Sequence, residues 1–213
     1  MKKIMILGAN NFLVPLIKTS KRLGFWTIVA SPNEKEPGFE YADEKVIVDL
    51  CDKNAVLEAA QKLKIDGIIS DQAETPVRTQ AFVANKMGLP GIGEDKAELF
   101  TNKYLMREKC REIGIDTIKY KLVDNVNDAA KFYEQIGKPM IMKPIDSAGS
   151  RGVVKIEAVQ NIYDQFDYSK DASKTGKVII EEYIPGKELL IDGVVFNGIY
   201  QTCLLYTSDA ADD

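Results

Sequence analysis

The sequence predicts an α/β protein: a doubly wound parallel-sheet domain over residues 1–95, then an incomplete α+β domain over 96–203. Early in the chain, short apolar runs alternate with amphipathic segments of about 10 to 15 residues, which is typical of βαβ units. Parallel neighbours need such crossovers because a tight turn cannot join them. Later, β-rich runs are separated by Pro-Gly and Asn-Gly, which favours antiparallel strands. Residues 204–213 show neither pattern and are expected to be a non-native tail.

The first domain is expected to contain four strands and three helices. An apolar run at 3–7 stops at Gly8-Ala9-Asn10, and helical spacing follows from Phe12 to Leu23. Asp52 is a suitable N-cap for a helix that presents Val56 and Ala60 on one face. The remaining elements are strands at 26–30, 45–49 and 66–70, and a helix at 76–86 that Gly88 and Pro90 end.

The second domain is expected to open with one amphipathic helix over 96–113, which carries Lys103 and Arg107 one turn apart. Asn197-Gly198 between two apolar runs predicts a type I′ hairpin. The other expected elements are helices at 127–136 and 160–166, strands at 119–123, 139–144, 153–157, 178–183, 188–196 and 199–205, and a loop at 146–152.

Composition excludes several classes of function. The chain has no His, so catalytic triads and His-based metal sites are absent from these residues. Its 28 basic and 32 acidic residues give a net charge of −4, which argues against nucleic-acid binding. No apolar run approaches the roughly 20 residues that a membrane span needs. Three widely spaced cysteines indicate neither a disulfide framework nor a zinc site, and a reducing, cytoplasmic compartment is expected.

The turn after the first strand is one candidate binding element. A dinucleotide fold needs G-x-G-x-x-G there and an acidic residue about 20 positions later, but only Gly8 is present and the second strand ends at Ser31. A nicotinamide-dependent oxidoreductase is therefore an alternative function that this turn supports only weakly. A turn in a degenerate α/β domain that contacts another substrate is the better interpretation.

Two later segments are candidates for nucleotide binding. Lys143 and the Ser/Gly-rich loop 146–152 offer an ammonium group and a row of backbone N–H groups to phosphate oxygens, although a simple glycine hairpin would have the same composition. No Walker P-loop is present. Segment 181–188 reads as strand, turn and strand; its extended backbone could pair with adenine, and Glu188 could accept from ribose hydroxyls.

Three segments, TNKYLMRE, GKPMIMKPIDSAGSRGV and IIEEYIPGKE, occur in the order and spacing of the ATP-grasp ligases. The preceding domain, with ILGAN, YADEKVIVD and GLPGIG, resembles the pre-ATP-grasp domain of those enzymes, so the likeness covers residues 1 to about 200. The resemblance implies that the nucleotide phosphates contact two lysines and a flexible loop, namely Lys103, Lys143, Ser147, Gly149, Ser150, Arg151 and Gly152. It also implies that adenine lies against Glu181, Glu182 and Ile184, chiefly their backbone, and that Glu188 holds the ribose.

The resemblance further implies an activity and its substrates. Such ligases use ATP to phosphorylate a small-molecule carboxylate and let an amine or a thiol displace phosphate from the acyl phosphate. Gly8, Asn10 and Glu74 are candidates for substrate contact. In such ligases the Mg²⁺ ligands, commonly a Glu pair with an Asn, lie on strands well beyond segment 181–188. This chain ends about 25 residues after Glu188, so it is expected to be C-terminally truncated and inactive by itself. A non-catalytic nucleotide-binding module remains a further alternative, and a homodimer remains open.

Overall fold

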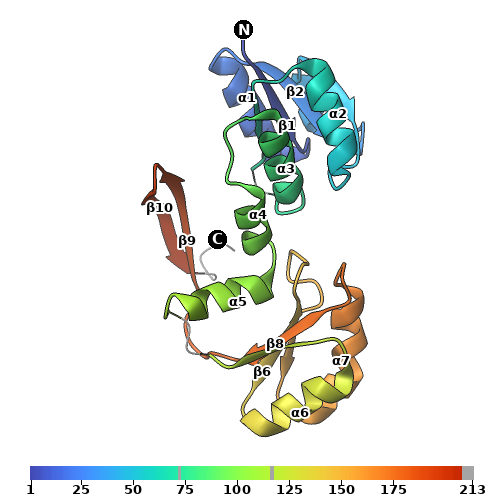
Figure 1. Ribbon diagram of the computed structural model, residues 1–213, viewed down its shortest axis with the longest axis vertical. Coiled ribbons are helices and arrows are strands. Elements are labelled where there is room, and N and C mark those ends of the chain that lie inside the picture. The colour runs from blue at the N-terminus through green and yellow to red at the C-terminus, as the bar shows by residue number, and fades with distance from the viewer. Residues whose placement is uncertain (72, 116–117, 208–213) are drawn as a thin grey trace.

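The computed structural model describes residues 1–71, 73–115 and 118–207. Figure 1 shows a parallel sheet at one end of the molecule and an antiparallel sheet at the other. Two helices, α4 (Glu94–Phe100) and α5 (Lys103–Glu112), lie between them. The predicted α/β architecture is thus confirmed, and α4 and α5 connect its two sheets.

The first sheet has the strand order β3-β2-β1-β4, and every neighbouring pair is parallel. β1 lies in the centre, where parallel strands are covered on both faces and read as continuous apolar runs. Its sequence KIMIL fits this position. The strands are β1 (Lys3–Leu7), β2 (Trp26–Ser31), β3 (Glu44–Ile47) and β4 (Gly67–Ile69).

Successive residues of β1 point to opposite faces of this sheet. Met5 and Leu7 pack with α2 and α3 in one core, whereas Ile6 packs with α1 and the 3₁₀ turns in the other. Asp52 caps α2 as expected, since its Oδ1 accepts from the backbone N–H groups of Asn54 and Ala55. The helical elements are η1 (Asn11–Leu13), α1 (Val14–Arg22), η2 (Pro37–Tyr41), α2 (Lys53–Leu63) and α3 (Val77–Met87).

The expected single helix over 96–113 is wrong, because the structure divides it into α4 and α5. Asn102 causes the break: its side-chain oxygen accepts from the N–H groups of Tyr104 at 3.1 Å and Leu105 at 3.2 Å, which starts a new helix. Lys103 therefore occupies the first position of α5. No helix in the described part of the chain is both long and apolar enough to cross a bilayer.

The second sheet is antiparallel with the order β5-β8-β6-β7. One face is covered by α6 and α7, and its core includes Met140, Met142, Phe166 and Ile180. α7 extends five residues past the predicted end at 166. The elements are β5 (Tyr120–Val123), α6 (Val126–Ile136), β6 (Met140–Pro144), β7 (Val154–Ile156), α7 (Val159–Asp171) and β8 (Val178–Glu182).

The chain continues as a two-stranded ribbon, β9 (Leu189–Phe196) and β10 (Ile199–Thr207), which stands apart from both sheets in Figure 1. Asn197 and Gly198 both have positive φ, 51° and 77°, as the predicted type I′ turn requires. β10 runs to Thr207 by pairing with β9, two residues past the predicted strand end at 205, and the non-native origin of residues 204–213 stays a prediction. The rest of that tail, residues 208–213, lies outside the described residues.

Gly152 at the end of loop 146–152 has φ +73°, and an added Cβ would lie 2.7 Å from the Ala172 Cβ. Gly149 has a similar φ of +64° but open space around it. We expect Gly152→Ala to lower the free energy of unfolding by about 1–3 kcal/mol more than Gly149→Ala, because only the former adds overpacking to backbone strain. Urea denaturation of both variants measures this difference, and equal losses would contradict it.

The β9–β10 ribbon exposes apolar side chains, among them Phe196 at 76% and Ile199 at 73%. We expect these 213 residues to self-associate at micromolar concentration through this surface. Replacing both residues with Thr should shift the protein toward monomer in sedimentation velocity, whereas Leu23→Thr at the exposed end of α1 should not. A sharp monomer peak for the unmodified chain would count against the prediction.

Candidate functional site

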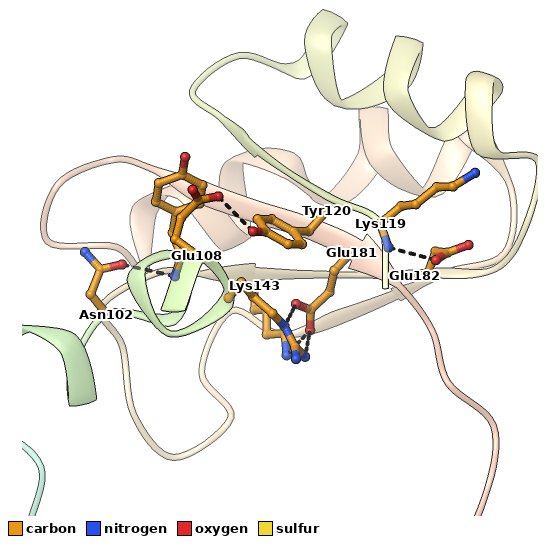
Figure 2. Close-up of polar contacts among 9 residues, drawn as sticks. Asn102, Glu108, Lys119, Tyr120, Lys143, Glu181 and Glu182 are labelled. Atoms are coloured by element: carbon orange, nitrogen blue, oxygen red, sulfur yellow. Dashed lines mark hydrogen bonds and ion pairs between the residues drawn. The ribbon is translucent and has the colours of Figure 1, made fainter. Parts of the chain in front are cut away.

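A buried carboxylate with two cationic partners lies on the face of the second sheet opposite α6 and α7. Glu181 in β8 is 3% exposed, and its carboxylate pairs with the Lys143 ammonium from β6. The Arg107 guanidinium from α5 also reaches it, with Nε 2.8 Å from Oε2 and Nη2 3.3 Å from Oε1. Figure 2 shows the Glu181 carboxylate directed at Lys143, while Glu182 projects elsewhere and accepts from the Lys119 N–H.

The two cations decide the charge of Glu181. Burial alone would raise the pKa of this carboxyl, but hydrogen bonds and charge from Arg107 and Lys143 outweigh burial and hold the pKa below its ordinary value. The group is therefore an anion at neutral pH. Arg107 and Lys143 together leave the cluster with one excess positive charge.

Lys103 brings a further ammonium group to the same region. Its Nζ donates to the Ser147 carbonyl at 2.5 Å, so α5 contacts the loop after β6. Partial burial lowers the pKa of Lys103; the Glu74 carboxylate opposes that effect and the Lys143 ammonium adds to it. The structure thus brings together Lys103, Lys143, Ser147 and Glu74, residues that lie up to 73 positions apart in the sequence.

The loop 146–152 is anchored at both ends. Asp146 accepts from the Ser173 hydroxyl at 2.8 Å, the Lys174 N–H at 3.0 Å and the Thr175 hydroxyl at 3.0 Å. The buried Ser169 hydroxyl donates to the Gly152 carbonyl at 2.6 Å. Between these anchors Gly149 and Ser150 adopt positive φ, and Arg151 donates to the Ala148 carbonyl. The loop ends are fixed on α7 and the turn after it, while its tip protrudes.

A cavity of about 390 Å³ separates this loop from the start of α3. Glu74, a candidate for substrate contact, lines it together with Ser147 and Arg151. Arg78 also lines it and is held by donating to the Thr101 hydroxyl at 2.6 Å. The cavity therefore combines acidic and basic side chains from the start of α3 with others from the loop after β6.

A second cavity, of about 460 Å³, adjoins residues 183–188, the segment between β8 and β9 that we call the hinge. It is mainly apolar, and Glu182 and Ile184 line it together with Tyr183 and Pro185. The Lys155 ammonium lies 4.7 Å from the centre of the Tyr183 ring at the same cavity. Extended backbone beside apolar side chains can accept the edge and face of a planar base.

Other candidates lie elsewhere. Gly8 and Asn10 are at the turn after β1, and neither lines the cavities described above. The Ala9 N–H of that turn donates to the Glu36 carboxylate at 3.2 Å, which also accepts from Ser31. A carboxyl group in this place repels a pyrophosphate and argues against the nicotinamide alternative.

Glu188 is exposed just before β9 and lines neither cavity, so its ribose contact stays a prediction.

Sequence reasoning missed the parts played by two residues. The sequence indicates only that Arg107 lies one turn from Lys103 and that Asp146 begins a loop. The four-residue spacing in α5 does indicate that Arg107 shares a side with Lys103. No local signal indicates that Arg107 pairs with Glu181, which is 74 positions away.

Mg²⁺ binding can be tested against the donor groups present. Across 1–71, 73–115 and 118–207, no three Cys, Asp or Glu side chains gather as a metal site would need. The described residues therefore offer no all-protein cluster of ligands for Mg²⁺, which proteins commonly hold through one or two carboxylates together with nucleotide phosphates.

Known proteins resemble this chain in sequence. The family model of the phosphoribosylglycinamide synthetase ATP-grasp (A) domain matches residues 101–209. Formate-dependent phosphoribosylglycinamide formyltransferase from Wolinella succinogenes is 28% identical over 186 residues, which cover 86% of this chain and 48% of that protein. The enzyme of the same name from Methanocaldococcus jannaschii is 25% identical over 187 residues, 85% of this chain and 48% of that protein. The chain thus spans about half the length of the curated relatives it matches.

Solved structures share the fold. Phosphoribosylglycinamide synthetase from Anaerococcus prevotii has a TM-score of 0.70 and 26% identity, with 97% of this chain and 51% of that chain covered. N5-carboxyaminoimidazole synthetase from Staphylococcus aureus, solved as a complex with ADP, has a TM-score of 0.80 and 20% identity. The match covers 97% of this chain and 54% of that chain. The family match, which spans both lysines, the anchored loop and the hinge, shows that this chain belongs to the ATP-grasp family.

Proposed function

We propose that these residues form the ATP-binding N-terminal portion of an ATP-dependent ligase that acts through an acyl phosphate. The observation that carries the proposal is the convergence of Lys103 and Lys143, from two different elements, beside an anchored glycine-rich loop. Two ammonium groups and free backbone N–H groups are what a triphosphate requires. The purine would occupy the hinge cavity beside Tyr183 and Ile184.

In this ligase, a carboxylate oxygen attacks the γ-phosphorus of ATP, and ADP leaves with the electron pair of the broken P–O bond. An amine then attacks the acyl carbon, inorganic phosphate leaves, and the nitrogen loses a proton. Positioning and charge neutralisation account for most catalysis in phosphoryl transfer, which suits a chain without His. Lys103 and Lys143 would neutralise phosphate charge, and the loop tip would close over the phosphates.

The substrates of the whole protein are proposed from its relatives and from the cavity at Glu74. The two curated relatives carry formate and phosphoribosylglycinamide in their name. A small carboxylate and a phosphoribosyl amine are therefore the substrates we propose. The 390 Å³ cavity supports this choice, since Glu74 could accept from an amine while Arg78 and Arg151 attract an anionic group. A homodimer stays a prediction.

The ATP site can be tested by calorimetry on the 213-residue chain. We expect Lys143→Ala to weaken ATP binding about tenfold or more, because a hydrogen bond to a charged group is lost. Glu188→Ala should weaken it less, through the ribose. Lys131→Ala on exposed α6 is the matched control and should leave the Kd unchanged. Unchanged ATP affinity in both Lys143→Ala and Glu188→Ala would remove the assignment.

Inactivity of these 213 residues by themselves also stays a prediction. We expect ATP to bind without turnover, because the resemblance places the magnesium carboxylates on strands well beyond the hinge and no cluster of metal-ligating side chains lies among the described residues. A phosphate-release assay with and without Mg²⁺ measures this, and a metal-dependent release by the purified chain would reject the prediction.

A further inference from the structure

Glu181, Lys143 and Arg107 form one charged cluster. Neither the proposed reaction nor the family resemblance assigns a role to Arg107. It contacts the carboxylate through two nitrogens, at 2.8 and 3.3 Å, in the forked geometry that suits a guanidinium. Its side chain is 30% exposed and that of Lys143 22%, while Glu181 is 3% exposed. Arg107 is thus directed at a carboxylate that is already paired with a lysine.

The pairing creates a conflict for Lys143. A lysine that neutralises a buried carboxylate cannot also neutralise a phosphate at full strength, and moving it away would leave the carboxylate unpaired. An unpaired buried charge is strongly destabilising. Because Arg107 keeps Glu181 paired, Lys143 can exchange the carboxylate for a phosphate without that penalty.

Arg107 is held in place independently of Lys143. Asn102 caps the first turn of α5, and the Tyr120 hydroxyl donates to Glu108 at 2.8 Å, which fastens the helix to β5. The rings of Tyr104 and Tyr120 meet edge to face, with centroids 6.2 Å apart. Figure 2 shows Tyr120 directed toward Glu108 on this helix. α5 therefore presents Arg107 to β8 whichever partner Lys143 has.

We infer that Arg107 is a positioning residue that retains the Glu181 carboxylate and thereby releases Lys143 to the phosphates of a bound nucleotide. The inference rests on the proposed ATP site and adds how that site is kept ready for a polyanion. It assigns Arg107 no direct contact with phosphate. The effect of Arg107 on ligand affinity should therefore depend on the charge of Glu181 and on the presence of phosphates in the ligand.

The experiment compares ATP with adenosine by calorimetry on the 213-residue chain. In Arg107→Met, Glu181 loses one of its two ion-pair partners and keeps Lys143, so we expect ATP affinity to fall about tenfold or more while adenosine affinity changes less than twofold. Arg107→Lys should recover part of the loss. Arg111→Met, one turn later on α5 and paired with Glu108, is the matched control and should behave as the unmodified chain.

A double variant separates positioning from direct contact. A glutamine at position 181 has no charge with which to hold Lys143. The double variant Glu181→Gln/Arg107→Met should therefore have the same ratio of ATP affinity to adenosine affinity as Glu181→Gln alone. A further fall in that ratio would show that Arg107 binds phosphate itself and would overturn the inference. The same comparison still tests the inference if the Arg107→Met single variant does not fold. A thermal melt shows whether that variant folds.

The remaining outcomes separate the two proposals. If the unmodified chain binds ATP but Arg107→Met changes neither affinity, or lowers both equally, the inference is overturned and the ATP site stands. If the unmodified chain binds neither ligand, the proposed function fails, and the inference fails with it.

Discussion

The buried carboxylate of Glu181 constrains the arrangement of the elements around it. Nearly full burial requires that its charge be paired, and both partners come from elements that are distant in sequence. Lys143 comes from the neighbouring strand β6, and Arg107 from α5, which lies between the two sheets. One charge thus joins the second sheet to the connecting helix, which also carries Lys103.

The same helix connects this cluster to the loop. Lys103 donates to the Ser147 carbonyl from the first position of α5, and Arg107 reaches Glu181 one turn later. The anchors of Asp146 and Gly152 fix the loop on the opposite side. A loop with fixed ends and glycines of positive φ can reorganise at its tip while its position stays defined. Hydrogen bonds to α7 and the turn after it thus fix the two ends of the loop beside the site.

The apolar ribbon β9–β10 contrasts with that well-connected region. Its backbone pairing is regular apart from one irregularity near Cys203, and its turn has the geometry that Asn-Gly favours. Its side chains nevertheless remain exposed over most of both strands. Local turn chemistry is sufficient to form the ribbon, but burial requires a surface that these strands do not contact.

The sequence by itself determined the order of strands and helices, the parallel pairing of the first sheet, the Asp52 cap and the Asn-Gly turn. These features depend on periodicity and on residues within a few positions of one another, so they can be read locally. The sequence did not show that Asn102 divides one long amphipathic segment into α4 and α5, since the apolar period continues across the break. Only the tertiary structure decided that Arg107 and Lys143 share Glu181, because an ion pair across 74 positions depends on sheet register and helix packing, which no local pattern contains.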